Sequence, residues 1–216
     1  MLHIKGASLE EAYKKTFLDL LNGERYDDPE IHREDSAAIE INASASNENL
    51  KNVNKKLFLK QEYSKLFPFI ESGLVEKEMD YWNDSLVKES KLFETIEYLR
   101  DNPLSKRAII LFWDDKYRDL SGPSVCEIAA FFRKKGEFLD MHTMMRANNV
   151  SFLLYMDMDV LTGVQSIVSS ALNLKPGKYI HFVNSLHFYK EEIETIEKQA
   201  NFLKKSALWN STRNTK

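Results

Sequence analysis

The stretch IAAFFRKKGEFLDMHTMM, residues 128–145, decides the fold. Both of its halves are rich in apolar residues, and the Lys-Lys-Gly sequence between them is a turn signal. We therefore expect two strands, residues 128–133 and 138–145, that are joined at this turn.

Further strands and helices flank this pair. Residues 108–113 (AIILFW) are almost all apolar and predict a short buried strand. Downstream, residues 160–174 predict a core helix, Lys175-Pro176-Gly177 a turn, and residues 179–183 a further strand. Such a mixture predicts an α/β (α+β) fold.

The N-terminal half has signals of its own. A capping box at residues 8–11 (SLEE) predicts a helix that ends at Gly23, and a polar loop follows. Residues 39–43 alternate apolar and polar side chains, as does a strand with one solvent-facing side. Residues 57–99 have a helical pattern. The last helix of this region is lined by Leu86, Leu92, Phe93, Ile96 and Leu99.

The composition indicates a soluble globular protein. Apolar residues make up 43% of the 216 residues, with 13 Phe and 9 Tyr, which is enough for a sizeable core. The net charge of −3 provides no basic field for nucleic acid, and no apolar run reaches the roughly 20 residues that cross a bilayer. With no signal-peptide pattern and one cysteine, we expect a cytoplasmic protein without disulfides or metal. We expect one domain over residues 1–216, with a polar tail from about residue 203.

Five side chains between residues 122 and 189 form a constellation with chemical potential. Cys126 is followed by Arg146 after 20 positions and by Asp157 after 31, and His187 and Tyr189 close the stretch. A thiol, a guanidinium, a carboxylate and a His-x-Tyr pair can together hold and attack a nucleotide.

This constellation resembles the thymidylate synthase family, which includes enzymes that hydroxymethylate cytidylates. The resemblance covers residues 101–189 and includes the spacing of Arg107, Cys126 and Arg146 as well as LxPG and HxY segments. It implies a mixed sheet covered by helices and a homodimer that forms through the sheet. Residues 1–100 match the family only loosely.

The resemblance implies that Cys126 is the catalytic nucleophile. A thiolate that adds to carbon 6 of a pyrimidine makes carbon 5 nucleophilic toward a one-carbon unit, which this family takes from 5,10-methylenetetrahydrofolate. A nearby guanidinium would favour the thiolate. The alternative is that Cys126 is a small buried apolar residue. The glutamate that manages protons in this family should lie in residues 57–75, where Glu62 and Glu71 are candidates.

The cations have implied roles at the nucleotide phosphate, for which a guanidinium fork is well suited. Arg146 would bind the phosphate beside the thiol, and Arg33, on a loop before a strand, would assist it. Lys106 and Arg107 would reach the phosphate in the partner subunit, so the active sites of a homodimer would be shared. Arg146 and Arg33 could instead be plain surface cations.

The same resemblance implies how the rest of the nucleotide is held. His187 and Tyr189 lie two positions apart, so on an extended segment they face the same side, where they would bind the sugar hydroxyl. Trp113 would lie beside the base. All three could instead be core residues.

The substrate prediction depends on Asp157. The family has asparagine here in thymidylate synthases and aspartate in cytidylate hydroxymethylases. A carboxylate only accepts hydrogen bonds, so it can bind the exocyclic amine of cytosine but not the carbonyl of uracil. The alternative is that Asp157 or Asp159 caps a helix that begins near Val160. A metal site at these aspartates lacks further ligands at suitable spacing.

The sequence also departs from the family pattern. Met145 and Ala147 replace a glutamine and a serine beside the phosphate arginine. Asn149 replaces an aspartate that contacts the pterin, and Glu127 stands where a histidine usually follows the cysteine. The C-terminal segment that closes over folate in the synthases has no counterpart, so water could trap the one-carbon intermediate.

These observations predict a transferase of nucleotide biosynthesis that hydroxymethylates CMP or dCMP. Asn149, like the other site residues, would bind the substrates. One alternative is a minimal thymidylate synthase that acts on dUMP. The other is a nucleotide-binding homologue without catalysis, which the loss of polar groups at Met145 and Ala147 favours. No membrane or nucleic-acid partner is expected.

Overall fold

The computed structural model of this chain describes residues 1–42, 80–82, 86, 90–114 and 125–205. Residues 44–56, which are rich in Ser, Asn and Lys and predict an exposed turn, lie outside this part of the chain, as does most of the helical region expected from residue 57. Among the described residues, no helix is long and apolar enough to cross a membrane.

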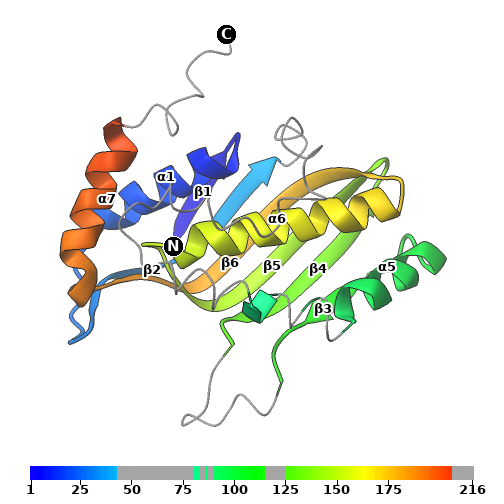
Figure 1. Cartoon of the computed structure of the whole chain (residues 1–216), viewed down its shortest axis with the longest axis horizontal. Coiled ribbons are helices and arrows are strands. Elements are labelled where there is room, and N and C mark those ends of the chain that lie inside the picture. The colour runs from blue at the N-terminus through cyan, green and yellow to red at the C-terminus, as the bar shows by residue number, and fades with distance from the viewer. Residues whose placement is uncertain (43–79, 83–85, 87–89, 115–124, 206–216) are drawn as a thin grey trace.

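Six strands form one mixed sheet in the order β1-β2-β6-β5-β4-β3 (Figure 1). The strands are β1 (Leu2–Gly6), β2 (Ile31–Asn42), β3 (Ile109–Leu111), β4 (Glu127–Lys135), β5 (Phe138–Asn149) and β6 (Lys175–Tyr189). The helices are α1 (Leu9–Leu21), α5 (Lys91–Asp101), α6 (Leu153–Ala171) and α7 (Ile193–Lys205), with a short 3-10 turn, η5 (Lys190–Glu192). The pairs β1–β2 and β5–β6 are parallel, and the other three are antiparallel. The expected mixed α/β architecture is confirmed.

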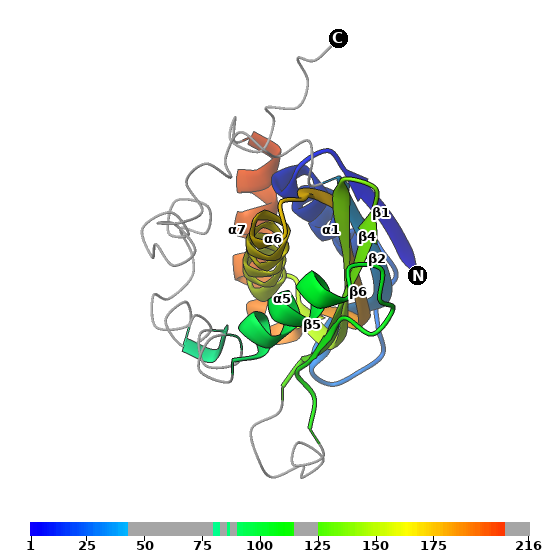
Figure 2. The same cartoon turned by 90° about the vertical axis from the view of Figure 1, so that its right-hand side faces the viewer.

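The labelled helices all lie on one face of the sheet, which Figure 2 shows nearly edge-on. The core fills the space beneath them. Phe17 of α1, for example, is fully buried against Phe188 of β6, with 4.8 Å between the ring centroids. Each large apolar side chain buried in this way stabilises the fold by roughly 1.5–3 kcal/mol. The other face of the sheet has no helix over it among the described residues.

The two central strands form as expected. Lys135 pairs with Phe138, so Gly136 and Glu137 make a two-residue hairpin loop between β4 and β5. Gly136 has φ of +60°, which a glycine adopts without steric cost. The turn chemistry and the apolar runs were therefore sufficient to predict this hairpin.

The position of α6 differs from the prediction. The helix begins at Leu153 instead of near Val160, and its N-cap, Phe152, makes no side-chain capping bond. Asp157 and Asp159 consequently lie inside the helix, and the interpretation of either residue as its N-cap is wrong. The segment is buried on several sides, so apolar periodicity did not mark where the helix starts.

The Lys175-Pro176-Gly177 segment is also not the expected turn. The chain turns earlier, at Leu172 and Asn173, and Asn173 has a left-handed φ of +54°. The Lys-Pro-Gly segment opens β6 instead. A Cβ on Gly177 would lie 3.1 Å from the backbone carbon of Leu139, so glycine allows β6 to approach β5 closely.

The N-terminal region is partly as predicted. Ser8 Oγ accepts a hydrogen bond from the Glu11 backbone N–H at 3.2 Å, which confirms the capping box, and α1 ends two residues before Gly23. β1 was not predicted. β2 begins at Ile31, so Arg33 lies on a strand and not on the expected loop.

Three further expectations need correction. β3 is not a buried strand, because Ile109 and Leu111 are 43% and 58% exposed on the open face of the sheet. Phe93 does not line the core face of α5, since it is 57% exposed. Finally, α7 continues to Lys205 with Leu203 buried, so the helix extends past the start that was expected for the polar tail, whose further residues lie outside the described part of the chain.

Polar side chains are buried beneath α6. The ring of His181 is fully buried, and its Nδ1 lies 2.8 Å from both Thr143 Oγ1 and Tyr179 Oη. Burial lowers the pKa of His181 from 6.5 to about 3. The folded protein therefore holds this imidazole neutral, whereas the unfolded chain protonates it below about pH 6.5.

We expect this histidine to make the protein acid-sensitive. As the pH falls below about 6.5, the unfolded state binds a proton at His181 that the folded state does not bind. The free energy of unfolding of wild type should therefore fall, relative to that of His181→Asn, by about 1.4 kcal/mol per pH unit. Urea unfolding of the two proteins as a function of pH measures this difference in slope. His3→Asn, at an exposed histidine of β1, is the control. Equal slopes for wild type and His181→Asn would contradict the prediction.

Candidate active site

The strand order brings the starts of β2 and β4 to the same end of the sheet as the ends of β5 and β6. β5 is antiparallel to β4 and parallel to β6, and β6 is antiparallel to β2. Most of the residues proposed from the sequence lie at or near these four strand ends (Figure 1).

Cys126 and Arg146 are in direct contact at this end. Cys126 directly precedes β4 and is partly exposed. The Arg146 Nη2 donates to the Cys126 Sγ at 3.7 Å, and the Arg146 Nε donates to the Val125 carbonyl at 3.0 Å. The Arg146 backbone N–H also donates to the Cys126 carbonyl at 2.9 Å. These bonds fix the guanidinium beside the sulfur, where its charge favours the thiolate.

His187 and Tyr189 lie on the neighbouring strand, β6. Asn149 of β5 pairs with His187, and the two rings of the His-x-Tyr pair are 4.7 Å apart between centroids. Burial lowers the pKa of His187, which keeps the ring neutral, and its Nδ1 lies 3.2 Å from the Ser185 carbonyl. Burial first, and then the negative charge of Cys126, raise the pKa of Tyr189. The tyrosine is therefore an electrostatic neighbour of the cysteine.

A carboxylate that the sequence did not reveal completes this region. Glu192, at the end of η5, accepts hydrogen bonds from Asn149 Nδ2 at 3.0 Å on both of its oxygens. Ser151 Oγ donates to the same carboxylate at 3.0 Å, and Asn149 Oδ1 accepts from the Ser151 backbone N–H at 2.8 Å. No motif distinguished Glu192 from the other charged residues before the last helix.

Asp157 projects from α6 into the buried layer beneath the helix. Its side chain is 2% exposed. Trp82 Nε1 donates to Oδ1 at 3.1 Å, and Asn148 Nδ2 donates to Oδ2 at 3.0 Å. Both partners were missed in the sequence, because their role depends on contacts between distant segments. Two donors on one carboxylate stabilise its ionised form.

Arg33 is close to the sugar-binding pair proposed on β6. It pairs with Phe188, and Ile31 pairs with Tyr189. The Arg33 Nη1 donates to the His32 carbonyl at 3.0 Å, while its buried Nε has no hydrogen-bond partner among the described residues. Burial, and next the positive charge of Arg25, lower the pKa of Arg33. Both effects would be relieved by an anion.

The remaining candidates from the sequence are Trp113, Lys106, Arg107, Glu62 and Glu71. The backbone N–H of Trp113 donates to the Ile128 carbonyl at 3.3 Å, which places the tryptophan just after β3 and near the start of β4. Lys106 and Arg107 are exposed between α5 and β3 and make no described contact with Cys126. Glu62 and Glu71 lie outside the described residues. Within the described part of the chain, no three His, Cys, Asp or Glu side chains gather as a metal site requires.

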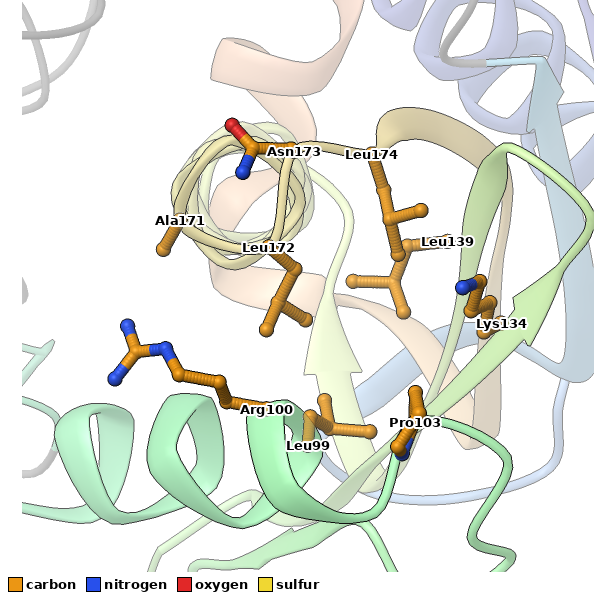
Figure 3. A pocket seen from close by; sticks show the side chains of 9 residues that line it. All are labelled: Leu99, Arg100, Pro103, Lys134, Leu139, Ala171, Leu172, Asn173 and Leu174. Carbon is orange, nitrogen blue, oxygen red and sulfur yellow. The ribbon is translucent and has the colours of Figure 1, made fainter.

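A cavity of about 240 Å³ lies elsewhere, between the ends of α5 and α6 and the β4–β5 hairpin (Figure 3). Lys134 and Leu139 line it, and these residues are at the far ends of the strands from Cys126 and Arg146. This cavity is therefore not part of the thiol site.

The fold and the site together define an α/β protein with a thiol–guanidinium site at one end of its sheet. Comparison with known proteins gives the family. Residues 73–209 match the sequence model described as thymidylate synthase. The chain belongs to the thymidylate synthase family, since this match covers more than half of it.

Individual relatives are distant. The thymidylate synthase of Streptococcus mutans serotype c is 27% identical over 137 residues, which are 54% of this chain and 49% of the relative. That of Streptococcus suis is 27% identical over 139 residues, 55% of this chain and 50% of the relative. That of Streptococcus agalactiae serotype Ia is 25% identical over 134 residues, 53% and 48% respectively. The chain spans about half the length of these curated relatives.

The contact between Arg146 and Cys126 predicts an unusually reactive thiol. Replacing Arg146 by alanine removes the positive charge that favours the thiolate, so alkylation of Cys126 by iodoacetamide at neutral pH should slow by about threefold to tenfold. Arg146→Lys, which keeps a charge but not the fork, should fall in between. Arg100→Ala, at an exposed position of α5, is the matched control. An unchanged rate in Arg146→Ala would show that the guanidinium does not activate the sulfur.

Proposed function

We propose that this protein transfers a one-carbon unit to carbon 5 of a pyrimidine nucleotide, and that it hydroxymethylates CMP or dCMP. The observation that carries the proposal is the contact between the Cys126 Sγ and the Arg146 Nη2 at 3.7 Å, at the sheet end where His187 and Tyr189 also lie. Membership in the thymidylate synthase family supports the same reaction class.

The proposed mechanism begins with the thiolate of Cys126. It adds to carbon 6 of the base, the electron pair moves onto carbon 5, and carbon 5 then bonds to the one-carbon unit. Loss of the proton from carbon 5 would let the donor amine leave the transferred carbon, and water would then add to that carbon and supply the hydroxyl. Departure of the thiolate restores the double bond between carbons 5 and 6. Arg146 and Arg33 would hold the nucleotide phosphate, and the neutral His187 with Tyr189 would hold the sugar.

Asp157 supports a cytidylate over a uridylate. Its carboxylate accepts from Trp82 Nε1 and Asn148 Nδ2, so it is held as an anionic acceptor. Such a group complements the exocyclic amine of cytosine and opposes the carbonyl oxygen of uracil. A second candidate, a thymidylate synthase that acts on dUMP, is favoured by the names of the relatives.

5,10-Methylenetetrahydrofolate is the proposed one-carbon donor. The fit of the described residues to a pterin is only partial. The side chain of Asn149, where the family has the pterin-contacting aspartate, is engaged by Glu192 and Ser151. A pterin would therefore meet the partly exposed Glu192 carboxylate, or would have to displace it from Asn149.

The decisive experiment measures release of tritium from carbon 5 of CMP, dCMP and dUMP, with and without methylenetetrahydrofolate. We expect release from a cytidylate and none from Cys126→Ala, because the adduct at carbon 6 is required. Asp157→Asn should shift the ratio of kcat/KM toward dUMP on the order of 100-fold, since an amide can both donate and accept. Release in Cys126→Ala at the wild-type rate would sink the mechanism. Nucleotide binding without release would favour a non-catalytic homologue.

The proposal includes a homodimer, and the open face of the sheet supports it. Leu111, Ala129, Met144 and Phe182 stand in one row across β3, β4, β5 and β6. The exposed fractions of Leu111 and Met144 are 58% and 39%. Phe131, 40% exposed, extends the apolar surface into the next row. An apolar sheet face of this kind is typical of an interface between subunits.

A charge on this face should separate the subunits. In a two-fold dimer Phe131→Glu would place two carboxylates in an apolar interface, so we expect light scattering to give the monomer mass where wild type gives the dimer. Leu104→Glu is the control, because Leu104 is 71% exposed and lies off this face. A monomeric wild type, or a dimeric Phe131→Glu protein, would contradict the proposed interface.

A further inference from the structure

Glu127 is the residue after Cys126, and its burial is unusual for a carboxylate. Its side chain is 0% exposed, and among the described residues neither carboxylate oxygen has a hydrogen-bond partner. It opens β4, opposite Met145 of β5, and the pairing slips between Glu127 and Ala129. The irregular register turns this side chain into the core, where an ionised group without partners is very costly.

The groups that surround Glu127 make its ionisation less favourable still. Burial is the largest cause and the negative charge of Asp157 the second, and together they raise the pKa of Glu127 well above its ordinary value. The backbone amide of Met144 acts in the opposite direction but less strongly. From β6, Tyr179 faces the same two carboxyl groups, and His181 is hydrogen-bonded to it. No described cation compensates the charge.

Glu127 and Asp157 therefore form a carboxyl pair whose members have different environments. Asp157 accepts hydrogen bonds from Trp82 and Asn148, which stabilise its anion. Neither oxygen of Glu127 accepts a hydrogen bond of good geometry from the described residues, and only the weaker influence of the Met144 backbone amide favours its anion. When two neighbouring carboxyl groups compete for one proton, the group without donors takes it.

The location of this proton decides which base Asp157 can bind. An ionised Asp157 accepts from the amine of cytosine. If the shared proton lay on Asp157 and Glu127 were the anion, the O–H of Asp157 could instead donate to the carbonyl oxygen of uracil. A neutral Glu127 thus keeps the neighbouring carboxylate selective for an amine.

We propose that Glu127 is a positioning residue that retains the proton of the Glu127–Asp157 pair, so that Asp157 remains an anionic acceptor for the exocyclic amine of a cytosine base. The identity of the base rests on the proposed function, whereas the position of the proton does not. The two parts are tested separately.

Infrared spectroscopy of the full chain tests the position of the proton. At neutral pH, wild type should show the carbonyl stretch of a protonated carboxylic acid, and labelling with ¹³C-glutamate should shift this band. Glu127→Gln should lack the band, and Glu94→Gln, at an exposed site of α5, should retain it. No acid band in wild type, or a band that survives in Glu127→Gln, overturns the proposal.

The coupling between the two carboxyl groups needs only proteins that retain Glu127, so it remains decisive if Glu127→Gln does not fold. Asp157→Asn removes the neighbouring negative charge, and the labelled band should then disappear at a lower pH than in wild type. An unchanged midpoint in Asp157→Asn means that the pair is not coupled and overturns the proposal.

Nucleotide affinity tests the consequence for base reading. Across the pH at which the acid band disappears, the Kd of wild type for CMP should stay constant, because Asp157 is an anion on both sides of this midpoint. A Kd that falls as the pH rises through the midpoint, by up to tenfold per pH unit, would mean that the titrating proton lies on Asp157, and this result overturns the link to base reading. If the protein binds neither CMP nor dCMP at any pH, the proposed function fails with it, although the infrared result still locates the proton.

Discussion

The pairing of β5 with β4 on one side and β6 on the other is the constraint on which the rest of the structure depends. β5 runs antiparallel to β4 and parallel to β6, so the start of one neighbour and the end of the other meet at its own C-terminal end. Arg146 sits there between Cys126 and the His187–Tyr189 pair. Because backbone ladders set these positions, the thiol and the guanidinium are held on rigid elements.

The second constraint is the buried polar layer under α6. Burial favours the uncharged forms of His181, Tyr179 and Glu127, because the charged form of each would lose its hydration. Asp157 is the exception, since Trp82 and Asn148 donate to it. The layer thus combines one carboxylate that accepts two hydrogen bonds with groups whose burial favours their neutral forms. In acid, protonation of His181 in the unfolded chain lowers the stability of the fold. At higher pH, ionisation of Glu127 in the unfolded chain lowers it, so the folded state is favoured at intermediate pH.

The sequence predicted the features that depend on local chemistry. The β4–β5 hairpin followed from two apolar runs and a glycine turn, and the capping box at Ser8 followed from its spacing. The site residues at Cys126, Arg146 and Tyr189 came from spacing and resemblance, and the structure brings them together.

Other features depend on tertiary contacts that no local pattern records. β1 contains polar residues on one side and becomes a strand only through pairing with β2. The start of α6 was hidden by apolar residues on all sides of Asp157, and the partners of that carboxylate come from Trp82 and Asn148. Glu192 gained its role from η5, which brings it to Asn149. Burial patterns of this kind follow from the assembled sheet rather than from periodicity.

The pairing of β2 with β6 has a consequence for the order of folding. Arg33 and Phe188 are partners in this ladder although 155 residues separate them, from 33 to 188. During synthesis β2 leaves the ribosome long before β6 exists, and its edge must wait unpaired, which exposes it to strand exchange with other chains. Closing so long a loop is slow because its entropy is lost before the contacts form. The end of the sheet that holds the site is therefore completed late, and a nascent chain gains the geometry of its thiol–guanidinium site only in the last stage of folding.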